Sequence, residues 1–459
     1  MSLINAGIGV SQKPNLIEAA EEAAKGARKE INGKKPKLLM FFLNFVYPQK
    51  DYQQALDKVY EIFEDKNIPF VGGPVIGFFA KDKYYFDASL LGKVVGFLLK
   101  GAEKIIKSLK LYGVAVIALE SDYLSVGVGL GKNAFQEPEN AGKESINEAL
   151  NNLEYNPSIA YLAMVKKGAR DITRFRPING FLLTPGNNFE GAIFDQKIVE
   201  GISSITKRTV RIAGGGLCSG IKLEKEGFSY ASPSLQFFNG KICEDSVISI
   251  VFGSDLEIGY GTSIGAESLG KTMFVTKAKD QVVEEIDFKP AVDRLSEIYR
   301  EAGFKERPMA LAFEGIVPAI PEGVSGFLWP VIPTKEEGKK VIFMSPIKEK
   351  TVLVLSRITK DACRGAVSKA VDLMVEDANT NNFGFILYSS CPVRSQILGV
   401  KYLQETLLIK KALGKENVPI FGLCSAGEIA FYKSGPPFGA TATITMMGIS
   451  NRLIAESNE

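Results

Sequence analysis

Two oppositely charged residues near the C-terminus have the types and the spacing of a small binding site. Arg394 follows one apolar run, and Glu428 follows the next. An arginine fork binds a carboxylate or a phosphate through two hydrogen bonds, and a glutamate binds an ammonium group. We therefore expect Arg394 and Glu428 to bind the two ends of an amino acid or a similar zwitterion. The structural alternative is that they pair with each other and join a helix to a turn.

Two cysteines, Cys391 and Cys424, lie in the same stretch and belong to the predicted ligand-binding set. A thiolate near an arginine has a lowered pKa, so Cys391 is the alternative candidate for a nucleophile. The chain has no histidine, and a catalytic Cys391 would need Glu428 or a lysine as its base. Cys424 has a second explanation as a small buried apolar residue, because Cys218 occupies almost the same place in an earlier turn.

Ser425 and Gly427 complete the predicted site. Both lie in a glycine turn, whose successive amides can form an anion-binding nest. Glycine is also what any tight turn with a positive φ requires. All three copies of the repeat have such a glycine turn regardless of chemistry, so we expect the turns to be mainly architectural. The Ser425 hydroxyl and Gly427 are the members expected to contact a ligand.

The composition excludes several kinds of function. The chain has 459 residues, 46% hydrophobic and 23% charged, which is typical of a soluble globular protein. A formal net charge of +3 is too small to attract nucleic acid or an anionic membrane. Without histidine and without clustered soft ligands, we expect no metal and no cofactor.

The location is predicted from what the chain lacks. The N-terminal residues contain no basic region followed by an apolar run, so no secretory peptide is expected. The most apolar stretches have about half the length needed to span a bilayer. The five cysteines are scattered, without a CxxC pair, which favours a reducing cytoplasm over a disulfide framework.

One segment matches the phosphate-loop pattern G-x-x-x-x-G-K-[ST], at residues 265–272. That mechanism needs a buried strand before the loop and a helix directly after it. The residues that follow, Met273–Thr276, are β-branched and aromatic, which favours a strand. We therefore do not expect a nucleotide-hydrolysing loop here.

A repeat organises the chain. Three segments end in similar glycine turns, at 68–79, 210–221 and 418–429, and the last two share Gly-Leu-Cys-Ser. An apolar run precedes each turn, at 38–45, 178–183 and 383–388. In the third copy Glu428 stands where the first copy has Phe78 and the second has Gly220 or Ile221.

The segments between runs and turns predict helices outside a sheet. In Tyr52–Phe63 the apolar residues recur at helical spacing, and alanine-rich helices are expected at 16–31 and 362–378. Gly-x-Gly strands frame the first two copies. Strands that alternate with helices of this length predict a mixed α/β fold, in which helices cover sheets built from repeated strand–helix–strand–glycine turn units.

The motifs of the third copy, Tyr388–Arg394 followed by Pro419–Glu428, resemble the C-terminal half of FIST-domain proteins. The stretch Ala213–Cys218, with Phe237–Ile242 and Val275–Ala278, resembles the FIST N-terminal half. The resemblance implies an N-terminal domain over 1–306, with repeat units at about 4–124 and 125–260. A Pro-spaced connection at 307–346 and a C-terminal domain at 347–459 would follow.

The FIST resemblance also implies a function. Such domains are sensory modules for small ligands such as amino acids, and they act in signal transduction. We therefore expect a small-molecule ligand and an unidentified signalling partner protein, with no nucleic acid and no membrane span. An enzyme that uses Cys391, as a hydrolase or transferase, is the alternative from a different class.

Overall fold

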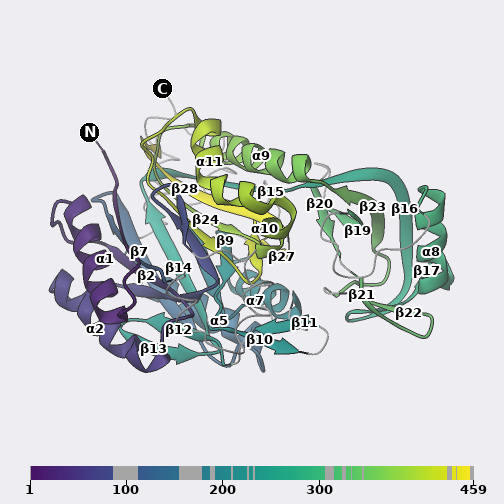
Figure 1. Cartoon of the computed structure of the whole chain (residues 1–459), viewed down its shortest axis with the longest axis horizontal. Helices are drawn as coiled ribbons and strands as arrows, with labels where there is room; N and C mark the ends of the chain where they lie inside the picture. The colour runs from purple at the N-terminus through teal and green to yellow at the C-terminus, as the bar shows by residue number, and fades with distance from the viewer. Residues whose placement is uncertain are drawn as a thin grey trace.

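The computed structural model describes the chain except for thirteen short or medium segments and the first residue. The described residues are 2–85, 112–154, 178–186, 192–207, 210–224, 227–230, 233–304, 315–322, 327–331, 333–343, 346–431, 437–440 and 442–454. Within these ranges the predicted mixed α/β class is confirmed, with helices on one side of each main sheet (Figure 1).

The chain folds as three consecutive units, each with its own sheet. Unit one contains β1 (Asn5–Ser11), α1 (Leu16–Glu30), β2 (Leu38–Asn44), α2 (Tyr52–Phe63), β3 (Phe70–Val75), β4 (Gly77–Ala80), β5 (Lys83–Tyr85) and β6 (Val114–Glu120). Unit two contains β7 (Leu124–Gly131), α5 (Pro138–Asn151), β8 (Ile178–Thr184), α7 (Ala192–Thr206) and β9 (Arg211–Gly216), then β10 (Ile221–Glu224), β11 (Gly227–Tyr230), β12 (Leu235–Phe238), β13 (Lys241–Glu244) and β14 (Val247–Ser254).

Unit three begins with β15 (Leu256–Ile264) and resumes at residue 360 after an inserted sheet. Its later elements are α9 (Lys360–Ala378), β24 (Phe383–Ser390), α10 (Pro392–Leu398), α11 (Glu405–Leu413), β25 (Ile420–Cys424), β26 (Glu428–Ala430), β27 (Phe438–Ala440) and β28 (Thr443–Leu453). A short 3₁₀ helix at Gly399–Gln404 joins α10 to α11. The corresponding connection contains α2 in unit one and α7 in unit two, whereas in unit three it contains α10, the 3₁₀ helix and α11.

The three sheets have the same strand order. They read β1-β6-β2-β3-β12-β13, β7-β14-β8-β9-β26-β27 and β15-β28-β24-β25-β4-β5. In each sheet four strands come from one unit, and the last two are a hairpin from another unit. Unit two extends the sheet of unit one, unit three that of unit two, and unit one that of unit three. This cyclic exchange binds the first and last parts of the chain together.

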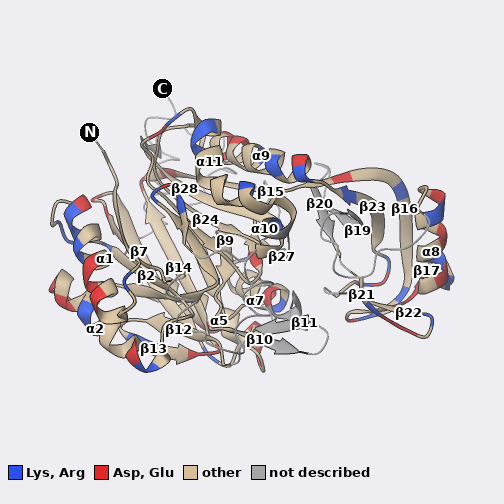
Figure 2. Ribbon diagram, in the orientation of Figure 1, with Lys and Arg blue, Asp and Glu red and all other residues tan. Residues whose placement is uncertain are grey.

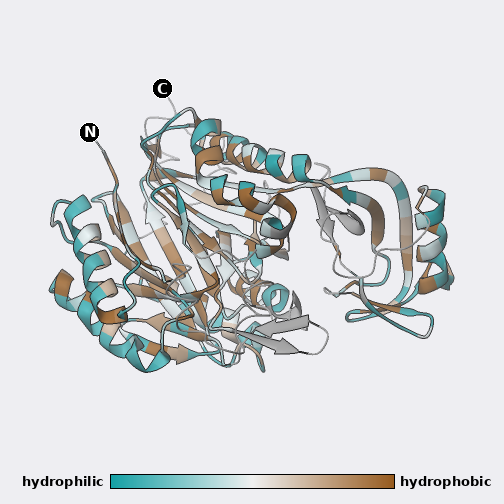
Figure 3. Cartoon of the chain, viewed as in Figure 1, coloured by the Kyte–Doolittle hydropathy of each residue, from teal (hydrophilic) through white to brown (hydrophobic). Residues whose placement is uncertain are grey.

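The sheets enclose a common apolar core. Side chains from all three units meet there, and Phe42 stacks on Phe421 with ring centroids 5.2 Å apart. Separate apolar clusters lie between each sheet and its own helices. Charged residues gather on the outer faces of the helices (Figure 2), and the strands between them are apolar (Figure 3).

Helices α1, α2 and α9 form where the sequence patterns predicted them. Helix α2 has the predicted bounds, and its residues Leu56, Val59, Tyr60 and Phe63 are buried. Helix α1 begins at a cap in which the side chain of Asn15 accepts two backbone hydrogen bonds. Such a cap satisfies amide groups that have no partner within the helix.

Glycines in the first strand of each unit let a helix lie directly on the sheet. The contacts are Gly9 with Ala23 of α1, Gly129 with Ser145 of α5, and Gly261 with Ala370 of α9, where an added Cβ would lie 1.7, 2.1 and 1.8 Å from the carbonyl oxygen. No side chain larger than hydrogen fits at these distances. The Gly-x-Gly strands are thus packing surfaces for the alanine-rich helices.

The structure places the unit and domain boundaries differently from our sequence prediction. The expected second unit included residues 256–260, but β15 pairs with β28 in the third sheet. The described residues between 266 and 358 form a further sheet with one helix, and this part projects from the three units (Figure 1). The stretch 307–346, expected to be a connection, contributes strands to that sheet, and its residues 307–314, 323–326, 332, 344 and 345 lie outside the described residues.

The inserted sheet has its own helix and core. Its elements are β16 (Ala266–Lys279), β17 (Val282–Ile286), β18 (Lys289–Pro290), α8 (Ala291–Glu301), β19 (Gly315–Glu322), β20 (Phe327–Pro330), β21 (Pro333–Glu337), β22 (Lys340–Phe343) and β23 (Val352–Ile358). The segment that matches the phosphate-loop pattern is the start of the long strand β16. No helix follows it directly, so it lacks the geometry of a phosphate loop.

Candidate functional site

The end of β24 brings together the predicted site residues of unit three. Strand β24 runs parallel to β25 and antiparallel to β28, and it ends at Ser390. The backbone N–H of Cys391 donates to the carbonyl of Thr443 (3.1 Å), and Pro392 starts α10. Because strand ends in such sheets meet loops from neighbouring strands, this edge is where side chains converge.

Glu428 is the centre of a buried polar cluster, which we call the carboxyl cluster: Cys391, Ser425, Glu428 and Thr443. The hydroxyl of Ser425 donates to Oε1 of Glu428 (2.9 Å), and that of Thr443 donates to Oε2 (3.1 Å). The Cys391 thiol is a further hydrogen-bond partner of the carboxyl group. Glu428 is 0% exposed.

Burial controls the protonation of Glu428. It raises the pKa of this carboxyl group to about 8, although the hydrogen bonds from Ser425, Thr443 and Cys391 act in the opposite direction. Among the described residues, Glu428 forms no ion pair. At neutral pH the carboxyl group is therefore mostly protonated, and a cation brought beside it would favour its ionised form.

The hairpin registers identify the residues equivalent to Glu428. Glu428 of β26 corresponds to Phe78 of β4 and to Gln236 of β12. Gln236 is fully buried, and it accepts a hydrogen bond (2.8 Å) from the backbone N–H of Ser246. Glu428 is thus the ionisable member of the three equivalents.

This equivalence corrects the sequence comparison for unit two, which aligned Gly220 or Ile221 with Glu428. The hairpin β10–β11 intervenes between the glycine turn and β12. The equivalent residue therefore comes later in the chain, at Gln236. An inserted hairpin of this kind shifts the alignment of all residues that follow it, and the spacing of short motifs does not reveal the shift.

Further hydroxyl groups lie beside the carboxyl cluster. The Oγ atoms of Ser389 and Ser390, and Oγ1 of Thr184 from unit two, are buried and have no hydrogen-bond partner among the described residues. Ser389 faces unit two, because a Cβ added to Gly215 would lie 2.3 Å from its Oγ. The equivalents of Ser389 and Ser390 in unit one are apolar, Phe42 and Leu43.

Arg394 lies in a second buried cluster. Its Nε and Nη2 donate to Oε1 of Glu405 (2.9 and 2.8 Å), and Nη2 also donates to the carbonyl of Cys363 (2.9 Å). The side chains of Arg394 and Glu405 are both 0% exposed. The alternative that Arg394 pairs with Glu428 is therefore wrong, because the cation is committed to Glu405.

The two clusters share one short segment of chain. Cys391 belongs to the carboxyl cluster, and Arg394 follows it within the first turn of α10, where its backbone N–H donates to the carbonyl of Cys391 (3.0 Å). One amino group of Arg394, Nη1, is buried without a hydrogen-bond partner among the described residues, as is Oε2 of Glu405. In the buried pair, one hydrogen-bond donor (Nη1) and one acceptor (Oε2) are thus available to a ligand.

The thiol of Cys391 is not activated in the way that the sequence predicted. Burial, and next the nearby Glu428, raise the pKa of Cys391 well above its ordinary value. Burial likewise raises the pKa of Cys424 to about 12. Arg394, which was expected to lower the pKa of Cys391, directs its charge to Glu405 instead. Both cysteines are therefore protonated thiols at neutral pH.

The glycine turns use their amides for contacts between units. Gly216 donates to the carbonyl of Gly427 (2.8 Å), and Ala426 donates to that of Gly216 (2.9 Å). Cys218 donates to Pro74 (2.9 Å), which joins units one and two. These amides are occupied, so the architectural role expected for the turns is the one that the geometry supports. Gly427 has φ +114°, a conformation that favours glycine.

Sequence reasoning missed the partners that decide both clusters. Glu405 and Thr443 lie 11 and 15 residues from Arg394 and Glu428, and Cys363 lies 31 residues from Arg394, all in other helices or strands. Thr443 contacts Glu428 because β28 is the neighbour of β24, which the sequence does not state. Glu405 carried one signal, a charged residue within an apolar helical stretch, but its partner could not be read from spacing.

Fold and site together define an α/β protein of three related units, in which one unit has a buried polar centre. The chain belongs to the FIST family: a FIST N domain matches residues 101–289 and a FIST C domain matches residues 291–431. FIST domains are sensory, ligand-binding domains of signal transduction. The FIST C match begins at α8 rather than at the expected residue 347.

Comparisons with curated proteins and with solved structures do not extend the family assignment. No curated protein matches the sequence. A crystal structure of cyanuric acid hydrolase from A. caulinodans is 7% identical, with 98% of this chain and 100% of that chain covered, at a TM-score of 0.30. A score this low shows neither a shared fold nor a shared activity. Among the described residues, no helix has the length and apolarity needed to cross a membrane.

Proposed function

We propose that the protein is a sensor of an amino acid or a similar zwitterion, with its binding site at the carboxyl cluster of unit three. The observation that carries the proposal is the contrast between equivalent positions. Phe78 and Gln236 are neutral, whereas Glu428 is ionisable and buried without a cation among the described residues. A packing role alone does not require this carboxyl group.

The ammonium group of the ligand would supply the missing positive charge. It would ionise Glu428 and donate a further hydrogen bond to the hydroxyl oxygen of Ser389, which lies on the same face of the sheet. The ligand carboxylate would bind Nη1 of Arg394, the buried donor without a partner. Cys391, Cys424, Ser425 and Gly427 would line this site. A buried charge is stabilised only when it is paired and hydrogen-bonded, and such a ligand meets both conditions.

Ligand binding at the carboxyl cluster would move part of the chain, and such a movement can act as a signal. Both clusters are buried, so a ligand must displace part of the chain to enter, and the connection formed by α10, the 3₁₀ helix and α11 contributes Arg394 and Glu405. Val400 and Leu407 on that connection are exposed, 78% and 47%. A partner protein that contacts them would detect the movement. None of the five cysteines forms a disulfide bond, which supports a cytoplasmic location.

The test is thermal unfolding with a panel of amino acids and simple amines. A ligand at about 100 times its dissociation constant stabilises the folded state by about 2.7 kcal/mol. We expect such a shift for wild type and for Glu416→Gln, a control in which an exposed glutamate is changed in the same way. Glu428→Gln should abolish the shift while retaining the fold, because Gln236 occupies the equivalent position.

Two results would overturn the proposal. The first is a ligand shift that persists in Glu428→Gln, which would place the site elsewhere. The second is the absence of any shift across the panel. If an amine without a carboxylate binds as well as the amino acid, only the proposed role of Arg394 is contradicted.

The alternative enzyme function, with Cys391 as nucleophile, lacks a supporting observation. Glu428 does contact Cys391, as a general base would. A thiol whose pKa is raised by burial and by a neighbouring carboxyl group is nevertheless a poor nucleophile.

A further inference from the structure

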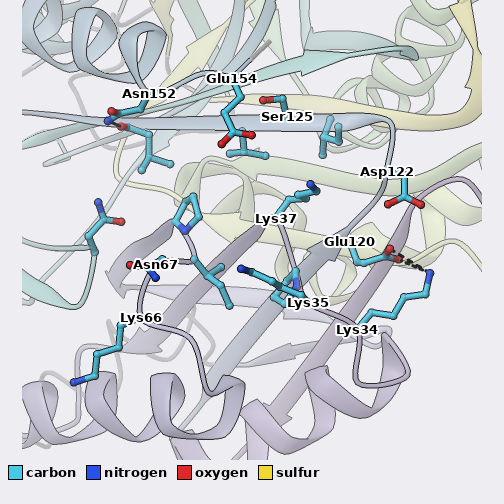
Figure 4. A pocket seen from close by; sticks show the side chains of 17 residues that line it. Lys34, Lys35, Lys37, Lys66, Asn67, Glu120, Asp122, Ser125, Asn152 and Glu154 are labelled. Carbon is cyan, nitrogen blue, oxygen red and sulfur yellow. Dashed lines mark hydrogen bonds and ion pairs between the residues drawn. The ribbon is translucent and has the colours of Figure 1, made fainter.

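A cavity lies between units one and two, and its residues are far in the chain from the carboxyl cluster. Its volume is about 1020 Å³, the upper end of the range for small-molecule sites. Its lysines come from unit one, in the loops before β2 and β3. Residues of the β6–β7 turn and of the segment after α5 form the opposite wall (Figure 4). We call this cavity the lysine groove.

One lysine of the lysine groove has its backbone fixed by a hydrogen bond to unit one's sheet. The backbone N–H of Lys37 donates to the carbonyl of Leu119 (2.7 Å), which fixes this residue at the start of β2. Lys34 pairs with Glu120 (3.2 Å) and Lys35 with Asp65 (2.6 Å). Lys37 forms no ion pair with any described residue, and Figure 4 shows its side chain extending toward the opposite wall.

The opposite wall carries acceptors. Asp122 and Glu154 line it and form no ion pair with described residues, and Ser125 adds a hydroxyl group. A polyanion such as nucleic acid would be repelled by these carboxylates. A ligand that is anionic at one end, with hydrogen-bond donors at the other, would satisfy both walls.

The floor between the walls is apolar. Pro69 and Val126 are half-buried and supply its exposed apolar surface, whereas Ile68 and Leu124 also line it but are at most 3% exposed. Such a floor takes a flat ring or an apolar body rather than a bare ion.

We propose that the lysine groove binds a nucleoside phosphate. The phosphate would lie at Lys37, with Lys66 at the entrance. The ribose hydroxyl groups would donate to Asp122 or Glu154, because carboxylates accept hydrogen bonds from sugar hydroxyls, and the base would lie on the apolar floor. The site is independent of the carboxyl cluster, since no residue is shared.

The experiment measures binding by calorimetry to the full-length protein with three probes: ATP, tripolyphosphate and adenosine. We expect ATP to bind more tightly than either of the others, and more weakly as salt is added. Lys37→Gln should weaken ATP binding about tenfold, a change of about 1.4 kcal/mol. The matched control is Lys401→Gln, an exposed lysine of unit three without an ion pair among the described residues, and it should bind as wild type does.

Each remaining outcome counts against the proposal. No ATP binding, or equal binding by Lys37→Gln and Lys401→Gln, would overturn it. Tripolyphosphate that binds as tightly as ATP would show a site for anions only and remove the nucleoside. Glu154→Gln provides an independent check on the opposite wall: it should weaken ATP binding and leave tripolyphosphate binding unchanged or stronger.

Discussion

Arg394 and Glu405 form an ion pair in which both side chains are 0% exposed, with Nε and Nη2 of the arginine on the same carboxylate oxygen. Arg394 also bonds to the carbonyl of Cys363 in α9. The pair therefore fastens α10 and α11 to the long helix that covers the third sheet. Its place in the fold explains why this arginine is buried and why it does not reach Glu428.

Removal of one partner should be costly, because the other charge would stay buried and unpaired. We expect Arg394→Ala to lower the free energy of unfolding by about 3–5 kcal/mol. Arg364→Ala, at an exposed position of α9, should change it by less than about 0.5 kcal/mol. Urea unfolding followed by circular dichroism measures both. Equal stabilities of the two variants would contradict the buried pair.

The raised pKa of Glu428 predicts a dependence of stability on pH. The folded state holds a proton up to about pH 8, whereas the unfolded chain releases it near pH 4.5. Between these values the folded state binds more protons, so the contribution of Glu428 to stability is present at low pH and is lost as the pH rises. The effect amounts to a few kcal/mol at most, at about 1.4 kcal/mol per pKa unit.

Glu428→Gln should remove this dependence. Relative to wild type, the variant should gain stability as the pH rises from about 5 to about 8, because it has no carboxyl group to ionise. Urea unfolding of both proteins at these two pH values tests the point. A constant difference in stability at both values would show that the carboxyl group is not perturbed.

Thiol reactivity should follow exposure rather than proximity to arginine. Cys243 is half-buried, whereas Cys391 and Cys424 are buried. Burial raises the pKa of all three thiols, and that of Cys391 is further raised by Glu428. With iodoacetamide at neutral pH, Cys243 should be alkylated first. Peptide mass spectrometry that finds Cys391 modified first would revive the nucleophile hypothesis.

The glycine contacts between strands and helices predict position-dependent effects of one substitution. In Gly261→Ala the new Cβ would lie 1.8 Å from the carbonyl oxygen of Ala370, so β15 and α9 must separate. We expect a loss of several kcal/mol or failure to fold. Gly365→Ala, in the same helix α9 with open space around it, should stabilise by about 0.5–1 kcal/mol. Thermal unfolding of both variants measures this contrast.

Much of the local structure could be predicted from the sequence. Apolar periodicity located α2 with its observed bounds, and the strand-like character of Met273–Thr276 correctly argued against a phosphate loop. These features depend on residues close in the chain, whose spacing directly reflects the helix or strand period. The mixed α/β class follows from the same patterns.

The candidate site was predicted only in part. Cys391, Ser425 and Glu428 do lie together, because the ends of neighbouring strands meet at one edge. Arg394 does not join them in any described ion pair or hydrogen bond with Glu428. A charged side chain takes the best partner within reach, and Glu405 is brought within reach by a helical connection that bends at Gly399. The spacing of Arg394 and Glu428 carried no information on this bend.

The amino-acid sequence by itself determined the composition of each unit: the apolar runs, the alanine-rich helices, the glycine strands and the placement of one ionisable residue, Glu428, in a turn. Only the tertiary structure decided which unit each strand completes, as β15 shows by pairing with β28. It also decided how Glu428 and Arg394 are paired and protonated. The physical reason is that strand exchange depends on contacts between segments far apart in the chain, and a pKa depends on what surrounds a group in space rather than on its neighbours in the chain.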